Sequence, residues 1–224
     1  MMGFLLSHVW IKKGQEYKHD LINRVLSHYK YNYPDYPIII SGHGIRPPEE
    51  VMHKAEYVIW YDDIIESEVG RGHPKCVSEG LLLAKKLGWK SVFKNRSDMI
   101  IGCNDIFDRL KEHKCVAFYE REDIHDISIF ANTDVFLDAW DQSKWDSNLN
   151  INGVINCNNS LRLHGHNVQD TFSLANNKWL PMVYIDPWWE EVFKNMSDET
   201  FFNNKFDTSK FTFFSGYSHR GQSI

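Results

Sequence analysis

The chain has 224 residues, of which 42% are hydrophobic and 25% charged, values that are ordinary for one soluble globular domain and argue against disorder. Its formal net charge of −5 argues against nucleic acid as a partner, because broad binding to nucleic acid needs a basic surface, but it is compatible with a local basic pocket for an anion. The four cysteines stand far apart and form no CxxC pair, which disfavours a zinc cluster or a disulfide framework and predicts reduced thiols in a cytoplasmic protein.

The N-terminal apolar run, from Phe4 to Val9, predicts a first β-strand. It lacks a basic leader and is too short for a signal peptide or a membrane span, and no other window reaches a membrane-spanning length. We therefore expect a cytoplasmic protein without a transmembrane segment, whose contact with a membrane would be peripheral.

The first hundred residues alternate between strand and helix patterns. Short apolar runs predict strands at 4–9, 36–41, 57–61 and 90–93. Helices are predicted between them, at 15–29, from 47 onward and at 74–87, with Gly88 in the position of a helix C-cap. Such alternation favours an α/β fold with a mostly parallel central sheet and helices on both of its faces.

The second half of the chain is less regular, and residues 143–159 are rich in Asn and Asp. We expect helices at 106–111, 135–140, 169–175 and 187–196, and strands at 115–119, 128–131 and 181–185. No internal repeat or low-complexity linker divides the sequence. A single domain is expected, with a regular half at 1–140 and a less regular half at 141–224.

Each of the four predicted parallel strands delivers polar residues to its carboxyl end. In open α/β sheets, ligands bind beyond the carboxyl ends of the strands, so these residues are expected to converge on one site. They are Ser7 and His8 from the first strand, Ser41, Gly42 and His43 from the second, Asp62 and Asp63 from the third, and Lys94, Arg96 and Asp98 from the fourth.

The charged residues Lys94, Arg96 and Asp98 alternate, so in an extended segment they would point to the same side. Charges that leave water need partners, because an unpaired buried charge costs several kcal/mol. One interpretation is a phosphorylated ligand, with the two cations on its phosphate oxygens and a divalent metal on Asp98. The other is a structural ion pair that shapes the strand end.

The segment from Asp62 to Ile101 resembles the central part of the WavE-type lipopolysaccharide-synthesis family and of related GT-A glycosyltransferases. The likeness rests on the acidic strand end DD at 62–63, the loop GRGH at 70–73, the helix motif GLLLA at 80–84 and the strand end KNRSD at 94–98. The opening LLSH at 5–8 and ISGH at 40–43 is similar to the first βα unit of that fold, so the resemblance covers about the first 140 residues.

This resemblance implies a GT-A-like glycosyltransferase that binds a nucleotide-sugar donor across its first strands and transfers the sugar to a glycan or polysaccharide acceptor, as in lipopolysaccharide biosynthesis. Residues 1–140 would then be the donor half and 141–224 the acceptor half. Asp98 matches the second acid of the D-x-D metal motif, which implies Mn²⁺ or Mg²⁺, whereas Arg96 stands where many relatives carry Asp and would neutralise part of the diphosphate. The donor contacts implied are Ser7, His8, His43, Asp62, Asp63, His73, Lys94 and Arg96.

An inverting transferase needs a carboxylate base for the acceptor hydroxyl. Asp170 looks like the acid that precedes a short helix in related transferases and is our candidate, with Asp134, Asp138 and Asp186 as alternatives. Each of these acids is also explained as a helix cap or a surface group.

The pair His164 and His166, in LHGHN, has the spacing of metal ligands on a strand, although a loop feature is an alternative interpretation. Phosphate-binding loops, nucleophile elbows and GxGxxG turns do not occur in the sequence. Their absence argues against a different α/β enzyme, such as a phosphotransferase or hydrolase. A non-catalytic nucleotide- or sugar-binding module of the same fold is the second hypothesis for function.

Overall fold

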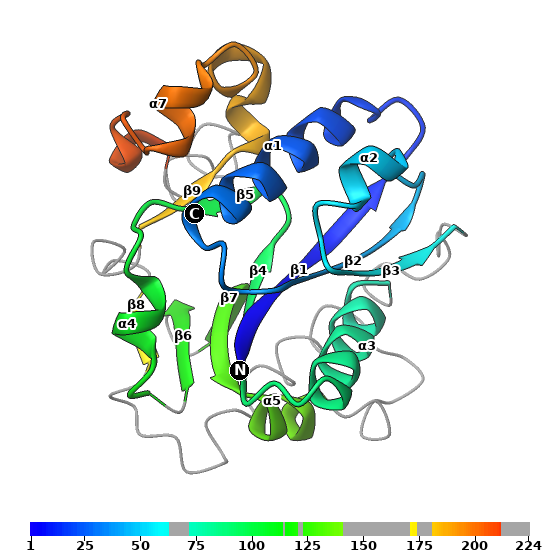
Figure 1. Cartoon of the computed structure of the whole chain (residues 1–224), viewed down its shortest axis with the longest axis vertical. Coiled ribbons are helices and arrows are strands. Elements are labelled where there is room, and N and C mark those ends of the chain that lie inside the picture. The colour runs from blue at the N-terminus through cyan, green and yellow to red at the C-terminus, as the bar shows by residue number, and fades with distance from the viewer. Residues whose placement is uncertain (63–71, 114, 121–122, 141–170, 174–180, 212–224) are drawn as a thin grey trace.

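The computed structural model describes residues 1–62, 72–113, 115–120, 123–140, 171–173 and 181–211 (Figure 1). Its central feature is a seven-stranded sheet with the strand order β3-β2-β1-β4-β7-β6-β8. The strands are β1 (Met2–Ile11), β2 (Ile38–Gly44), β3 (Tyr57–Tyr61), β4 (Ser91–Arg96), β6 (Cys115–Glu120), β7 (Asp123–Asn132) and β8 (Thr171–Ser173).

Four neighbouring strands, β3, β2, β1 and β4, are parallel to one another. Strand β7 runs antiparallel to both β4 and β6, and β8 runs parallel to β6. A second, two-stranded antiparallel sheet joins β5 (Met99–Ile101) to β9 (Met182–Tyr184). The α/β class with a mostly parallel central sheet is therefore confirmed.

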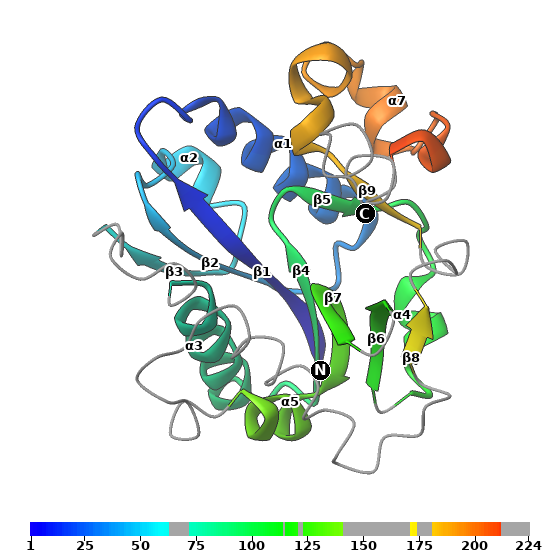
Figure 2. The same cartoon turned by 180° about the vertical axis from the view of Figure 1, so that it is seen from behind.

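Helices cover both faces of the sheet (Figures 1 and 2). On one face, α1 (Tyr17–Asn32) and α2 (Glu49–Met52) pack on the larger apolar cluster, together with α4 (Ile106–Leu110). On the other face, α3 (Gly72–Lys86) and α5 (Thr133–Ala139) pack on the smaller cluster. Among the residues described, no helix combines the length and apolarity that crossing a membrane requires.

Helix α3 lies close to β1 because Gly80 faces it without a side chain. A Cβ at Gly80 would come within 2.4 Å of a methyl group of Leu5. The helix ends as the sequence predicts: Gly88 has a positive φ of 75°, and the Trp89 amide bonds back to the carbonyl of Ala84 at 2.9 Å. This is the Schellman arrangement, which glycine adopts at no steric cost.

Strand β1 contains an irregularity that decides which of its side chains face α1 and which face α3. Leu6 pairs with Ile40 and Val9 with Gly42, so β1 holds one extra residue between these pairs. Phe4 and Leu6 before this bulge, and Val9 and Ile11 after it, all pack into the α1-side cluster although their parity differs. A bulge of one residue has this effect, because it exchanges the two faces for every later side chain.

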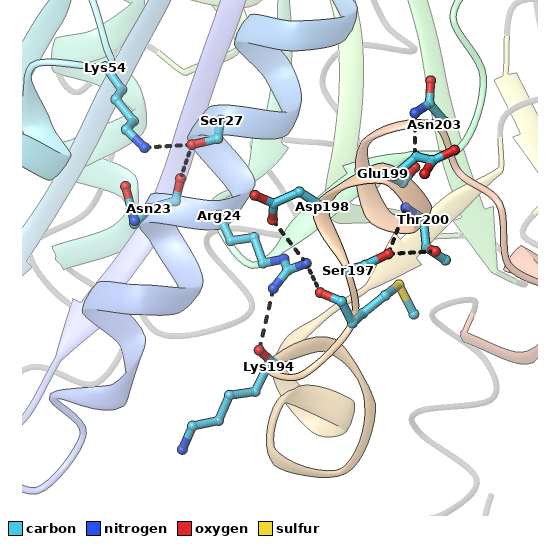
Figure 3. A network of polar contacts seen from close by, with 11 residues as sticks. Asn23, Arg24, Ser27, Lys54, Lys194, Ser197, Asp198, Glu199, Thr200 and Asn203 are labelled. Atoms are coloured by element: carbon cyan, nitrogen blue, oxygen red, sulfur yellow. Dashed lines mark hydrogen bonds and ion pairs between the residues drawn. The ribbon is translucent and has the colours of Figure 1, made fainter.

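Short helical elements follow β9. Of these, α7 (Asp198–Phe202) packs against α1, and η5 (Trp189–Phe193) is tied to α1 at its C-terminal end, whereas η6 (Thr208–Phe211) packs against β9. Arg24 of α1 binds this part of the chain: its guanidinium donates to the carbonyl of Lys194 at 3.4 Å and forms an ion pair with Asp198 at 3.4 Å (Figure 3). It also donates to the carbonyl of Met196.

Two predicted helices are wrong. Residues 169–175 were expected to be helical, but Thr171–Ser173 form β8, because the outer edge of β6 offers backbone partners that a local pattern does not reveal. Residues 187–196 form the 3₁₀ turn η4 (Asp186–Trp188) followed by the π-helical η5 rather than one α-helix. The Lys194 amide bonds to the carbonyl of Trp189, five residues back, which is the π-helical spacing.

Candidate functional site

The sheet has a topological switch point between β1 and β4. From β1 the chain proceeds outward to β2 and β3, and α3 then returns it to β4 on the opposite side of β1. Ser7 and Arg96 are the last residues paired between β1 and β4; beyond them β1 continues beside β2 to Ile11, whereas β4 ends. Open α/β sheets bind ligands at a switch point of this kind.

An ion pair lies where β4 leaves the sheet. Arg96 donates through Nε to one carboxylate oxygen of Asp98 at 2.8 Å and through Nη2 to the other at 2.7 Å. The two side chains are 18% and 13% exposed, so the pair is largely removed from water. Tyr184 of β9 adds its hydroxyl, 3.2 Å from Nη2, and its ring centre lies 5.0 Å from the guanidinium carbon.

The charged side chains alternate along an extended strand, as expected, only up to Arg96, where β4 ends. Lys94 and Arg96 belong to β4, but Ser97 and Asp98 form the turn between β4 and β5, so Asp98 does not continue the strand. Lys94 is fully buried, and its Nζ lies 6.0 Å from the ring centre of Trp140, at the end of α5. The prediction that three charges share one side of an extended segment is therefore wrong for Asp98.

Strands β1, β2 and β3 bring three aromatic side chains into one row. Trp10 is in register with His43, and His43 with Tyr61. The Trp10 and His43 rings stack with centroids 5.6 Å apart at 22°. Lys12 places its Nζ 3.6 Å from the Trp10 ring, and Lys75 of α3 places its own 4.0 Å from the Tyr61 ring. We call Trp10, His43 and Tyr61 the aromatic row.

Two serines predicted near the site have different surroundings. The Ser41 hydroxyl donates to the carbonyl of Cys76 at 2.8 Å and so anchors α3 to β2. The Ser7 hydroxyl is fully buried beside Arg96 in register and has no hydrogen-bond partner within the described part of the chain. Ser7 and His8 lie at the bulge inside β1, four and three residues before its end.

Other predicted residues are only partly placed. Asp62 follows β3 directly and is exposed. The backbones of His8 and His73 belong to β1 and to the first turn of α3, while their side chains are not described. Asp63, His164, His166 and Asp170 lie outside the described residues.

Two of the three alternative acids, Asp134 and Asp186, are engaged elsewhere. Asp134 is exposed and pairs with Lys85 at 2.7 Å. Asp186 accepts from the Tyr17 hydroxyl at 3.0 Å and lies 3.7 Å from the Lys18 ammonium. Asp138 is half-buried on α5.

The described residues do not fit a divalent ion. Both carboxylate oxygens of Asp98 already accept from Arg96, and no group of three or more His, Cys, Asp or Glu side chains suited to a metal occurs in the described ranges. A hard cation prefers several oxygen ligands, which Asp98 in this ion pair does not supply. The predicted Mn²⁺ or Mg²⁺ therefore stays a prediction.

Sequence reasoning missed Trp10, Tyr184 and Asn95 at this edge. Trp10 enters the aromatic row only because of the bulge in β1, which no pattern in the sequence marks. Tyr184 reaches Arg96 from a strand 88 residues away. Asn95 was detectable in principle, because a polar residue between Lys94 and Arg96 in a strand with two covered faces must turn toward a helix.

No family model matches this sequence, and no curated protein matches it either. Three of the solved structures to which the chain is similar have the names of enzymes. One is a 4-diphosphocytidyl-2C-methyl-D-erythritol synthase from Anaerococcus prevotii, with 8% identity over 77% of this chain and 87% of that chain and a TM-score of 0.48. The others are a nucleoside-diphosphate-sugar pyrophosphorylase from Vibrio cholerae (12% identity, 82% of this chain and 95% of that chain, TM-score 0.47) and a cytidylyltransferase from Leptospira borgpetersenii (9%, 100% and 98%, TM-score 0.47). Because the scores are this low, the fold class rests on the strand order described above.

Proposed function

We propose that this chain is a glycosyltransferase that binds a nucleoside-diphosphate sugar and transfers the sugar to a hydroxyl group of a glycan. One observation carries the proposal: the switch point between β1 and β4 is bordered by a largely buried Arg96–Asp98 pair, in the segment that resembles GT-A glycosyltransferases. A polysaccharide or lipopolysaccharide acceptor, reached by peripheral contact with a membrane, belongs to the same proposal.

In this proposal the aromatic row and its two lysines hold the nucleoside. A flat base can stack beside Trp10 and His43, and ammonium groups on Lys12 and Lys75 favour an anionic ligand nearby. Ser7, whose buried hydroxyl lacks a partner within the described residues, adds a donor next to Arg96. These groups lie along one edge, as a ligand with a base at one end and a diphosphate at the other requires.

Arg96 is the proposed catalytic cation. During transfer, the bond between the anomeric carbon and the diphosphate oxygen breaks, and its electron pair leaves with the diphosphate. A guanidinium that donates to a phosphate oxygen stabilises the negative charge that grows there. The acceptor oxygen forms the new bond, and its proton passes to a carboxylate base, for which Asp170 remains our candidate.

A divalent ion is not needed for any step written here. If Mn²⁺ or Mg²⁺ binds, it would neutralise further diphosphate charge, with Asp98, His164 and His166 as the proposed ligands. Binding at Asp98 would require Arg96 to release at least one carboxylate oxygen.

The proposal is tested by thermal unfolding of the chain with nucleoside diphosphates and nucleotide sugars of each base, with and without Mn²⁺. A ligand present at 100 times its dissociation constant adds about 2.7 kcal/mol of stability, which raises the midpoint by several degrees. A rise with one or more of these ligands, followed by detection of sugar transfer or donor hydrolysis, supports the proposal. No shift with any nucleotide would contradict it.

A second candidate is a binding module of the same fold without catalysis. The observation that favours it is the mutual engagement of Arg96 and Asp98, because a carboxylate held by both oxygens is poorly placed to bind a metal. Nucleotide binding without any turnover of a nucleotide sugar, in the presence of Mn²⁺ and of glycan acceptors, would decide for this candidate.

A further inference from the structure

A buried polar network lies beneath the turn that carries Arg96 and Asp98. Asn95 accepts on its side-chain oxygen from the Arg96 amide at 2.9 Å and from the Ser128 hydroxyl, and its amide nitrogen donates to the Tyr29 hydroxyl at 2.7 Å. The Tyr29 hydroxyl donates in turn to the carbonyl of Met99 at 3.4 Å. Asn95, Tyr29 and Ser128 are fully buried, so these contacts are made in the absence of water.

The network holds the turn from both sides. The network makes two contacts to the backbone, at the Arg96 amide and at the Met99 carbonyl. Arg96 and Met99 are the residues immediately before and after the Ser97–Asp98 turn. The turn residues are also held: the Ser97 amide donates to the Ser7 carbonyl at 3.0 Å, and the Ile185 amide donates to the Asp98 carbonyl at 2.9 Å. Four consecutive residues therefore each have a backbone group bound by a different partner.

An apolar core would have been the simpler solution at this place. Tyr29 packs with its ring edge toward Phe4 at 4.7 Å between centroids, in a cluster that is otherwise apolar. Polar groups buried there have to satisfy one another completely, because a partly satisfied network costs more than an apolar one. Burial also raises the pKa of Tyr29 well above its ordinary value, so its hydroxyl stays neutral and keeps its proton for the Met99 carbonyl.

We propose that Tyr29 and Asn95 are positioning residues, which fix the turn at 96–99 so that Arg96 and Asp98 are held in place before the diphosphate of the ligand arrives. This inference rests on the proposed function for the identity of the ligand. The holding of the turn itself is independent of it. Fixing charged groups in advance is what makes them effective in binding and catalysis, because no reorganisation is then needed when charge develops.

The chain contains a matched control for Tyr29. Tyr33 lies four residues later, at the C-cap position directly after the same helix. It is also buried and donates its hydroxyl to a backbone carbonyl, that of Cys103. Its partner does not belong to the turn. Tyr29→Phe and Tyr33→Phe each remove one buried hydroxyl and its bond to a backbone carbonyl. Tyr29→Phe also removes the acceptor of the Asn95 amide, and only this variant removes a contact to residues 96–99.

The experiment compares these two variants with the unchanged chain by amide hydrogen exchange and by calorimetric titration with the nucleoside diphosphate that binds best. We expect Tyr29→Phe to speed the exchange of the Arg96 and Ser97 amides and to weaken nucleotide binding by about tenfold, the upper range for one hydrogen bond. Tyr33→Phe should change neither, although it also loses a buried hydrogen bond and some stability toward unfolding.

The outcomes separate the two proposals. If the amides of residues 96 and 97 exchange at the same rate in Tyr29→Phe as in Tyr33→Phe, the positioning role is overturned, whichever ligand binds. If no nucleotide binds the unchanged chain, the proposed function fails, and the exchange data alone decide on the positioning. Should Tyr29→Phe not fold, Ser128→Ala takes its place, because it removes one donor to Asn95 and leaves the Tyr29 ring; unchanged exchange in that variant would equally overturn the inference.

Discussion

Arg96 and Asp98 are bound to each other by two parallel hydrogen bonds across the turn that ends β4. A bidentate contact between a guanidinium and a carboxylate is strong and directional. It shapes the strand end, as one of the two interpretations of KNRSD proposed. It also keeps a guanidinium at the carboxyl edge of the sheet, where the other interpretation, a phosphorylated ligand, needs one.

The first prediction concerns this ion pair. Asp98→Asn removes the carboxylate that accepts two hydrogen bonds from the largely buried guanidinium of Arg96, and we expect a loss of about 3 kcal/mol in the free energy of unfolding, measured with urea. Asp134→Asn is the control, because its carboxylate pairs with Lys85 at the surface, where the two side chains are 73% and 59% exposed, and little change is expected. Equal effects of the two variants would contradict the structural importance of the pair.

A second prediction concerns the pH dependence of stability. His28 is fully buried, its Nε2 lies 3.1 Å from the Asn204 side-chain oxygen, and burial lowers its pKa from 6.5 to about 4. The unfolded chain therefore binds a proton at His28 more readily than the folded chain does. The stabilising contribution of neutral His28 to the free energy of unfolding is fully present above pH 6.5. It decreases as the pH drops from 6.5 toward 4, and this one group accounts for a loss of about 3 kcal/mol in that window.

The measurement for His28 is urea unfolding at several pH values. His28→Gln should flatten the slope between pH 6.5 and 4, whereas His53→Gln, at a side chain that is 79% exposed, should leave it as it is. The assignment of the slope to His28 is refuted if both variants keep the same pH dependence as the unchanged chain.

A third prediction concerns the attachment of residues 189–204 to α1. The Arg24 guanidinium binds the Lys194 carbonyl and Asp198 (Figure 3). Its central carbon also lies 4.6 Å from the ring centre of Phe201. Arg24→Lys keeps a positive charge but loses the planar fork, so we expect a loss of about 2 kcal/mol. Faster amide exchange should be localised to residues 194–204.

The control for Arg24 is Arg46→Lys, because Arg46 makes a comparable ion pair with Glu49 at an exposed position. It should leave both stability and amide exchange nearly unchanged. If exchange in 194–204 does not respond to Arg24→Lys, attachment depends on the other contacts of this segment, such as the apolar contacts of Phe201 and the His28–Asn204 hydrogen bond.

A fourth prediction concerns the end of α3. Gly88 has a φ of 75°, and nothing lies within 4 Å of the place where a Cβ would stand. Gly88→Ala should therefore cost about 1 kcal/mol through backbone strain without any clash, and Gly88→Asn should cost less because Asn tolerates the left-handed conformation. Equal stability of Ala, Asn and Gly at this position would contradict the described cap.

The parallel part of the fold could be predicted because its elements are specified locally. The strand at 57–61 is found at its predicted limits, and the helix predicted at 74–87 is α3, with Gly88 as its cap. Apolar runs and helical spacing suffice where each strand is buried on both faces. The errors fall on β8 and on η4 with η5, whose structure depends on distant partners such as the edge of β6.

The candidate site could be predicted only in outline. The rule that ligands gather at carboxyl strand ends led to Ser7, His43 and Arg96, which do lie along that edge. The bulge in β1, the contact of Arg96 with Tyr184 and the attachment of Asn95 to Tyr29 depend on tertiary packing. No spacing in the sequence encodes these relationships, so the aromatic row and the network beneath the turn became visible only in the structure.

The most direct test of the central claim is a map of nucleotide binding on the backbone amides by NMR. On addition of the nucleoside diphosphate that stabilises the chain best, the proposed site predicts shifted amide signals at Ser7, His43 and the 96–98 turn, with little change at 115–117 in β6. Signals that stay in place along this edge at saturating nucleotide, or that move only around β6, would contradict the account.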